Sequence, residues 1–256
     1  MNEGRRGTEM TDEPKSIENP IHLEYHIRQH VRRRAELVAK EIKPYVTSKS
    51  KCVFYVAGGC LAGPIADIDL FPGPADFPEI TAEKICTSRN ATTYKTGQHP
   101  IQVCNYRYDS LRKLLESFDY AHIQVGAELT FMPQSLDPAD NFKTVKPELS
   151  VTRADFTDRF ILAHTTDSTW YCGSEYPLSS MIRAGKYQKK GVLKRSGYIK
   201  AVLNALVDVL DRGFKDYEDF KDQLDAVDLG LVPEELEDIE TANLAKLYEH
   251  LTKDRK

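Results

Sequence analysis

Residues 52–71 read CVFYVAGGCLAGPIADIDLF, two short apolar runs separated by a pair of glycines. The first run, Cys52–Ala57, is continuous, β-branched and aromatic, which predicts a buried strand. Gly58 and Gly59 break this run, and the second run, 66–71, alternates apolar and acidic residues as a strand does. We therefore expect two strands joined by a short connection that begins at a glycine turn.

The second run carries two carboxylates, Asp67 and Asp69, and strand residues at this spacing point to the same face. Two such carboxylates repel each other, and ionised carboxylates are costly to desolvate beside apolar neighbours. Magnesium relieves this cost, because it takes carboxylate oxygens together with substrate phosphates. The preceding glycines let a phosphate approach backbone N–H groups closely. The alternative is a strand end with two solvated acids after an ordinary turn.

This order of strand, glycine pair, spacer and acidic strand resembles the polymerase-β-type nucleotidyltransferase superfamily. Further segments resemble a nucleotidyltransferase-like group of phages and bacteria, and together they cover about residues 50–195: NATTYK (90–95), IQV (101–103), SFDYAHIQV (117–125) and SSMIRAGKYQKKGV (179–192). The resemblance implies an α+β fold, in which a mixed sheet with helices is followed by a helical domain across a cleft.

The superfamily places a third carboxylate on a neighbouring strand, and the sequence offers two candidates for that position. Gln102 lies in the apolar IQV segment, where many members have an Asp, but its neutral amide is a weaker magnesium ligand. Asp119 precedes the AHIQV segment and supplies a charge, unless it is a solvated acid at a helix end. We expect Asp67, Asp69 and Asp119 to be the catalytic metal ligands, with Mg²⁺ or Mn²⁺ as the ion. A site with two carboxylates stays open as the alternative.

The net charge is −4, from 35 basic and 39 acidic residues, yet the basic residues are concentrated in one segment. Seven of them and no acid lie in 182–200, which indicates a local anion site rather than a uniformly cationic surface. Arg183, Lys186 and Lys190 share one helical face beside Tyr187, an arrangement suited to a nucleoside triphosphate. The alternatives are a solvated surface helix and contact with an RNA or DNA backbone.

The resemblance implies an enzyme that moves a nucleoside monophosphate from an NTP to an acceptor and releases pyrophosphate. The acceptor is RNA, protein or a small molecule, and the sequence does not separate these. The nucleotide-binding residues that we expect are Gly58, Gly59, Arg183, Lys186, Tyr187 and Lys190. Because Gln102 replaces an expected Asp, the alternative is a catalytically degenerate module that binds a nucleotide or RNA. A third hypothesis is a toxin or defence component that modifies a host RNA or protein.

Composition and periodicity predict the organisation of the chain. We expect a polar, flexible arm over 1–18, the α/β domain over 19–150 and the helical domain over 151–256. The predicted strands beyond the first two are 91–95, 101–106 and 121–129. The predicted helices are 20–45, 109–117, 178–191, a segment around Ile199–Leu210 that ends at Gly213, and one or two within 233–251.

Several other classes of protein lack support in the sequence. No run approaches the ~20 apolar residues of a membrane span, and the N-terminus has no secretory h-region, so we expect a cytoplasmic protein without a membrane partner. The five cysteines are odd in number and lack CxxC spacing, which favours buried thiols, Cys60 included. P-loop, GxGxxG and GxSxG motifs are missing. His22, His26 and His30 share a helix face, but without a cysteine partner we do not expect a zinc site.

Overall fold

The computed structural model describes residues 20–88, 90–133, 135–137 and 143–225, together with 246, 248, 249 and 252. The predicted arm, 1–18, lies outside the described residues, as does nearly all of the predicted helical segment 233–251.

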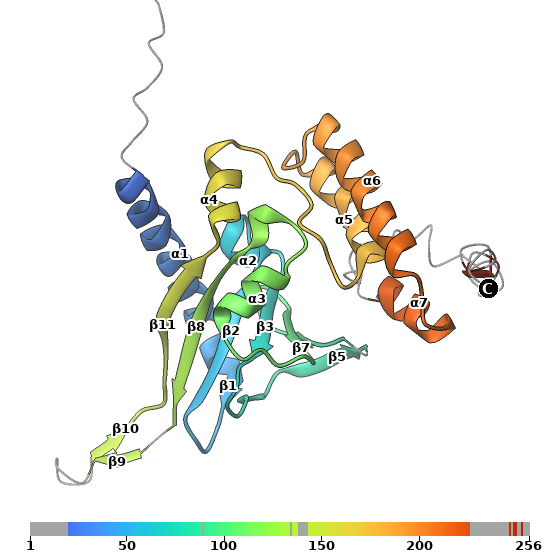
Figure 1. The fold of residues 1–256 in the computed structure, drawn as a ribbon. Coiled ribbons are helices and arrows are strands. Elements are labelled where there is room, and N and C mark those ends of the chain that lie inside the picture. The colour runs from blue at the N-terminus through green and yellow to red at the C-terminus, as the bar shows by residue number, and fades with distance from the viewer. Residues whose placement is uncertain are drawn as a thin grey trace, which may run out of the picture.

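A seven-stranded mixed sheet forms the centre of the fold (Figure 1). Its spatial order is β11 (Glu148–Phe156), β8 (Val125–Met132), β2 (Cys52–Ala57), β3 (Ile68–Pro72), β7 (Ile101–Cys104), β6 (Ala91–Lys95) and β5 (Glu83–Thr87). Only β3 and β7 pair in parallel among these described strands, and the other neighbours are antiparallel. Two small antiparallel pairs flank the sheet: β1 (Val46–Thr47) with β4 (Glu79–Ile80), and β9 (Ser135–Asp137) with β10 (Lys143–Val145).

The helices fall into those that pack on the sheet and those that follow it. The first set is α1 (Pro20–Ile42), α2 (Gly59–Ala62), α3 (Leu111–Ser117) and α4 (Asp158–Thr165). The second set is α5 (Pro177–Lys189), α6 (Arg195–Arg212) and α7 (Tyr217–Asp225). Short 3₁₀ turns lie at Lys43–Tyr45 and Ala121–Ile123. The predicted α+β class, with a mixed sheet followed by helices, is confirmed (Figure 1).

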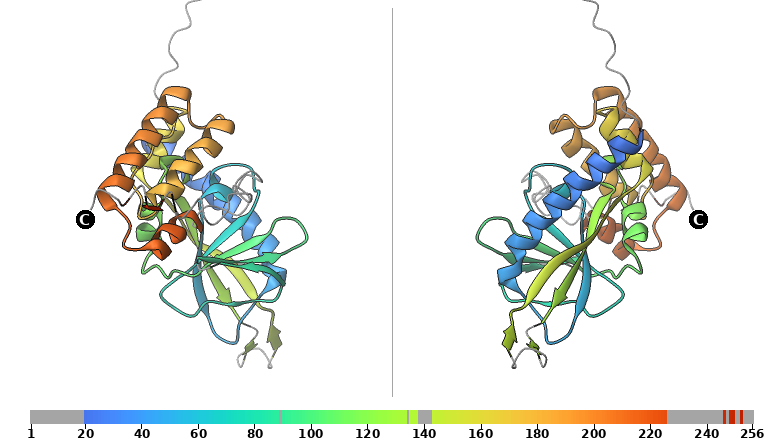
Figure 2. Two further views of the ribbon diagram at one scale, coloured as in Figure 1. Left: turned by 90° about the vertical axis from the view of Figure 1, so that its right-hand side faces the viewer. Right: turned by 90° about the vertical axis from the view of Figure 1, so that its left-hand side faces the viewer.

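The continuous apolar character of β2 follows from burial on both faces of the sheet. Phe54 and Val56 pack in the core shared with α1, whereas Tyr55 and Ala57 pack with the leucines of α3. Helix α1 crosses the first of these faces, as Figure 2 shows in its right-hand view. The helix contributes six buried residues to that core: Ile27, Val31, Ala35, Val38, Ala39 and Ile42.

The predicted element boundaries are close to the observed ones, with four informative differences. Strand β3 begins at Ile68 rather than residue 66, and the 121–129 segment makes a 3₁₀ turn before β8 begins at Val125. Strands β5 and β11 were not predicted. The expected domain boundary at 150/151 falls inside β11, which pairs with β8 from Glu148 to Phe156, so the sheet continues beyond it.

Within the described residues, no helix combines the length and apolar character needed to cross a bilayer.

Gly126 lets α3 lie directly on the sheet, and its replacement tests this packing. A Cβ there would lie 2.9 Å from Leu111 Cδ1, 2.9 Å from Leu115 Cδ2 and 3.0 Å from Ala57 Cβ. Overpacking of a core costs about 1–3 kcal/mol, so we expect Gly126→Ala to lower the free energy of unfolding by that amount. Chemical denaturation followed by circular dichroism measures this change.

The matched control is Gly185→Ala, because a Cβ on this α5 residue meets nothing within 4 Å. Alanine is about 0.5–1 kcal/mol more favourable than glycine inside a helix, so this variant should gain stability. Equal effects of the two substitutions would contradict the proposed packing of α3 on Gly126.

Candidate active site

The glycine turn after β2 is held in place by backbone and side-chain contacts. Gly58 has a φ of +87°, which disfavours any other residue, and its N–H donates to the Val125 carbonyl at 2.9 Å. Gly59 begins the single-turn helix α2. From α1, Arg34 Nη2 donates to the carbonyl of Cys60 at 2.8 Å and to that of Gly63. The turn is therefore fixed between the sheet and α1.

Strand β3 separates its apolar and acidic residues between the two faces of the sheet. Ile68 and Leu70 are fully buried in the core under α1. Asp67 and Asp69 lie on the other side, where both line a cavity of about 880 Å³. Parallel pairing of β3 with β7 places Gln102 beside Asp69. The predicted pair of carboxylates on one face is thus present, with a neutral amide as its neighbour.

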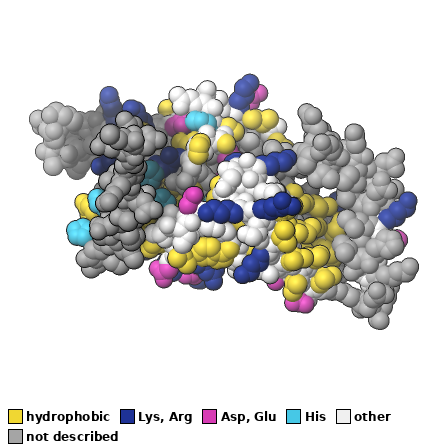
Figure 3. Space-filling view, turned by 90° about the horizontal axis from the view of Figure 1, so that it is seen from above, with side chains coloured by type: hydrophobic (Ala, Val, Ile, Leu, Met, Phe, Trp, Pro, Cys, Tyr) yellow, Lys and Arg dark blue, Asp and Glu magenta, His cyan; other side chains and the backbone are white. Residues whose placement is uncertain are grey.

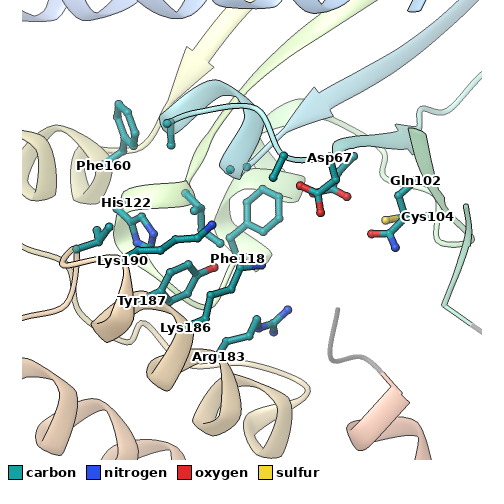
Figure 4. A pocket seen from close by; sticks show the side chains of 18 of the residues that line it. Asp67, Gln102, Cys104, Phe118, His122, Phe160, Arg183, Lys186, Tyr187 and Lys190 are labelled. Atoms are coloured by element: carbon teal, nitrogen blue, oxygen red, sulfur yellow. The ribbon is translucent and has the colours of Figure 1, made fainter. Parts of the chain in front are cut away.

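Two basic residues of α5 and the lysine at its C-cap line the same cavity from the helical side. Arg183, Lys186, Tyr187 and Lys190 all contribute to its wall, as do Gly58 and Gly59 on the sheet side. Figure 4 shows Asp67 on one side and the side chains of the three cations on the other, directed toward the same space. All the predicted site residues except Asp119 therefore line one cavity. The first and last of them, Gly58 and Lys190, are 132 positions apart in the sequence.

Asp119, predicted as the third carboxylate ligand, is not among the residues that line this cavity. Its side chain is only 3% exposed and does not line the cavity. Instead, Asp119 Oδ2 lies 2.9 Å from Arg183 Nη2. A buried carboxylate needs a cation, and Arg183 provides one, so Asp119 holds the arginine that lines the cavity. In the described part of the chain, no three Asp, Glu, His or Cys side chains are placed to hold a metal ion by themselves.

Gln102, the other candidate for the third position, lies next to Asp69 on the neighbouring strand. Its amide Nε2 lies 3.4 Å from Thr93 Oγ1, within hydrogen-bonding distance, and Thr93 pairs with it on the next strand, β6. Asp69, Gln102 and Thr93 therefore form a cross-strand row on the cavity side. Of the two candidates for the third position, Gln102 therefore lines the cavity and Asp119 does not.

His122 also lines the cavity, although the sequence favours a structural histidine at this position over one that supports the site. Its Nδ1 lies 2.9 Å from Thr169 Oγ1, and its ring meets the Tyr187 ring edge-on at 4.4 Å between centroids. Burial, and to a lesser degree the charge of Lys190, lower the pKa of His122 to about 4. The imidazole is therefore neutral at pH 7. It packs with Tyr187 and does not add to the positive charge of Arg183, Lys186 and Lys190.

Tyr187, predicted as a nucleotide contact, is also a core residue of the helical half. It is 8% exposed and belongs to the core of the helical half, with its ring 4.7 Å from that of Tyr120. Its side chain nevertheless forms part of the cavity wall (Figure 4).

Two side-chain hydrogen bonds connect the sheet half of the protein to the helical half at the cavity. Tyr176, the residue before α5, donates from its Oη to Tyr106 Oη at 3.0 Å, and Tyr106 donates to Asn90 Oδ1 at 2.8 Å. Tyr106 and Tyr176 also line a second cavity of about 800 Å³, which borders α6 and α7. These two tyrosines therefore form a partition between the cavities. Neither was singled out in the sequence, because the contact joins residues 70 positions apart.

Neither a cysteine nucleophile nor a histidine metal site is supported by the described residues. Cys60 is 1% exposed, and burial raises the pKa of its thiol well above the ordinary range, so it remains a protonated packing residue. His22, His26 and His30 lie on α1, and within the described residues no other metal-binding side chains join them in a cluster.

Two solved structures resemble this chain at low sequence identity. No protein-family model matches the chain, and no curated protein matches its sequence. A CCA-adding enzyme in complex with CTP superposes with a TM-score of 0.40 and 12% identity, over 91% of this chain and 51% of that one. A tRNA-processing enzyme in an apo form superposes with a TM-score of 0.36 and 11% identity, over 86% of this chain and 58% of that one. The chain thus spans about half the length of these structures, and at such scores neither match bears on its chemistry.

The buried imidazole of His122 predicts a pH dependence of stability. Its pKa is about 4 in the folded state and about 6.5 when unfolded, so the unfolded chain binds more protons between these values. Stability is therefore lost as the pH falls from 6.5 to 4, by up to about 3 kcal/mol from this group. We expect urea unfolding at pH 7 and pH 4 to show a larger drop for the wild type than for His122→Gln. Parallel pH profiles for the two proteins would contradict this assignment.

Proposed function

We propose that this protein is a metal-dependent nucleotidyltransferase, which moves a nucleoside monophosphate from an NTP to an acceptor and releases pyrophosphate. The observation that carries the proposal is the cavity between sheet and helices, where Asp67 and Asp69 on one wall face Arg183, Lys186 and Lys190 on the other. Its volume of about 880 Å³ lies in the range of small-molecule sites, about 300–1,000 Å³.

The mixture of charges identifies the kind of ligand. Three cations on one helical face suit the phosphates of an NTP, because each Lys or Arg makes charge-assisted hydrogen bonds with phosphate oxygens. Two carboxylates in the same cavity would repel that triphosphate. A divalent cation between them and the phosphates turns this repulsion into attraction. A bound nucleotide together with a metal ion therefore accounts for both walls.

The residues present fit magnesium, with manganese as the alternative. Mg²⁺ is usually bound by one or two carboxylates, completed by substrate phosphates and water, rather than by a cage of protein ligands. Asp67 and Asp69 supply those two carboxylates, and Gln102 beside them offers at most a neutral amide oxygen. When bound, the ion would polarise the α-phosphate and neutralise charge on the leaving oxygen.

The protein's own residues would bind and orient the reactants. Lys186 and Lys190 would hold the β- and γ-phosphates, and Arg183, fixed by Asp119, would add a third cation in a set position. The backbone at Gly58 and Gly59 would lie against a phosphate. The acceptor oxygen would attack the α-phosphorus, and the bond from that phosphorus to the β-phosphate oxygen would break. The acceptor, whether RNA, protein or small molecule, is left for experiment to identify.

A catalytically degenerate nucleotide- or RNA-binding module is the second candidate. The neutral Gln102, hydrogen-bonded to Thr93 next to Asp69, is the observation that favours it. Such a module would bind nucleotide in the same cavity without turning it over.

A labelling experiment tests the proposal. The protein is incubated with each α-labelled NTP, magnesium and a cell extract, beside the Asp67→Asn/Asp69→Asn double variant. We expect label on RNA, protein or a small molecule with the wild type, and at least about 100-fold less with the variant, because the metal's carboxylates are gone. Undiminished labelling by the variant would refute the mechanism. Nucleotide binding without transfer of any of the four labels would favour the binding module.

A second experiment tests the basic wall. Loss of a charge-assisted hydrogen bond costs about 1.5–3 kcal/mol, so Lys186→Ala and Lys190→Ala should each weaken NTP binding by about tenfold or more. Isothermal titration with a non-hydrolysable NTP measures this. Lys189→Ala is the control, since Lys189 lies on the same helix, is exposed and does not line the cavity. An equal loss of affinity for Lys189→Ala would mean that general charge, not the cavity, attracts the nucleotide.

A further inference from the structure

Helix α6 turns its large apolar side chains outward and its small ones inward. Ala201, Ala205 and Val209 are buried in the helical half, at most 3% exposed. The large residues are 37% to 55% exposed: Ile199, Leu203, Leu206, Val207 and Leu210. A helix with two apolar faces is expected to bury both, and only one is buried within the described part of the chain.

The exposed residues form one continuous strip that faces away from the sheet. Figure 1 shows α6 on the far side of α5 from the strands, and Figure 3 shows hydrophobic side chains gathered at this side of the molecule. None of the five lines either cavity described above. The strip is therefore separate from the proposed active site and needs a partner of its own.

The spacing within the strip is that of a coiled-coil seam. Ile199, Leu203, Leu206 and Leu210 follow one another at intervals of four, three and four residues. This is the alternation of the a and d positions that pack helices side by side. These four positions are also spaced symmetrically about the middle of the strip. In an antiparallel pair of α6 helices, Ile199 of each copy would therefore lie against Leu210 of the other, and Leu203 of each against Leu206 of the other.

Two charged residues beside the strip would also form ion pairs between antiparallel copies of α6. Lys200 and Asp211 are both exposed and lie eleven residues apart, three helical turns, so they share one edge of the strip. In an antiparallel pair related by a twofold axis, this edge of one helix meets the same edge of the other. Lys200 of each copy then lies within about one turn of Asp211 of the other, which gives two symmetric ion pairs.

We propose that the protein forms a homodimer through α6, with the two helices antiparallel and the strip buried between them. The partner is a second copy of this chain, because both the apolar pairing and the charge pairing are self-complementary.

Sedimentation equilibrium of the full chain, from about 1 to 100 μM, tests the proposal. We expect a mass of twice the 29.1 kDa chain. Leu203→Glu should place two charges in the seam and raise the dissociation constant at least about 100-fold. Leu162→Glu is the matched control, since Leu162 is 53% exposed on α4 and should leave the mass unchanged. Thermal unfolding confirms that each variant is folded.

The charge pair gives the sharper test. Lys200→Glu and Asp211→Lys should each weaken the dimer about tenfold, because each creates two like-charge contacts across the twofold. Together the two substitutions exchange the charges and should restore the wild-type dissociation constant. A monomeric wild type would overturn the proposal. So would a double variant no tighter than the single ones, as expected if another segment of this chain or a different protein covers the strip.

Discussion

The ion pair between Asp119 and Arg183 joins the segment between α3 and β8 to the helix that carries the cations, and the shape of the cavity depends on it. The neighbouring Tyr120 adds a buried hydrogen bond from its Oη to the Ser180 carbonyl at 2.8 Å. Removal of one partner from a buried ion pair costs about 3–5 kcal/mol, since the other charge is left without compensation. The two walls are therefore held at a fixed separation by a contact that lies behind the cavity rather than in it.

The carboxylates and the glycine turn at the cavity are also held by packed elements behind them. Asp67 and Asp69 alternate with the fully buried Ile68 and Leu70, so the strand cannot slip by one residue without exposing its core side chains. The glycine turn is held by Arg34 from the opposite face of the sheet. Such rigid support is what a site needs when it must place phosphates and a metal ion with little freedom.

Local pattern was sufficient for the parts of the fold in which neighbouring residues act together. The apolar run of β2, the glycine turn, the paired carboxylates and the face of α5 were all read correctly, because their spacing alone sets their direction. The ion pair of Asp119 could not be predicted, because its partner, Arg183, lies 64 residues away and no short-range signal reveals a distant cation. Strand β5 has a largely polar sequence without a clear alternation, and the alternation of β11 is interrupted at the irregularity between Val151 and Arg153. The pattern over Ile199–Leu210 predicts a helix but not which of its apolar faces is buried.

The hydrogen bonds from Tyr176 to Tyr106 and from Tyr106 to Asn90 lie at the partition between the two cavities. A neutral hydrogen bond contributes only about 0.5–1.5 kcal/mol, so a small free energy holds the two tyrosines together. Separation of their rings would join the spaces on either side of them into one. In the proposed reaction, such a joined space would let one molecule leave without passing the one that enters.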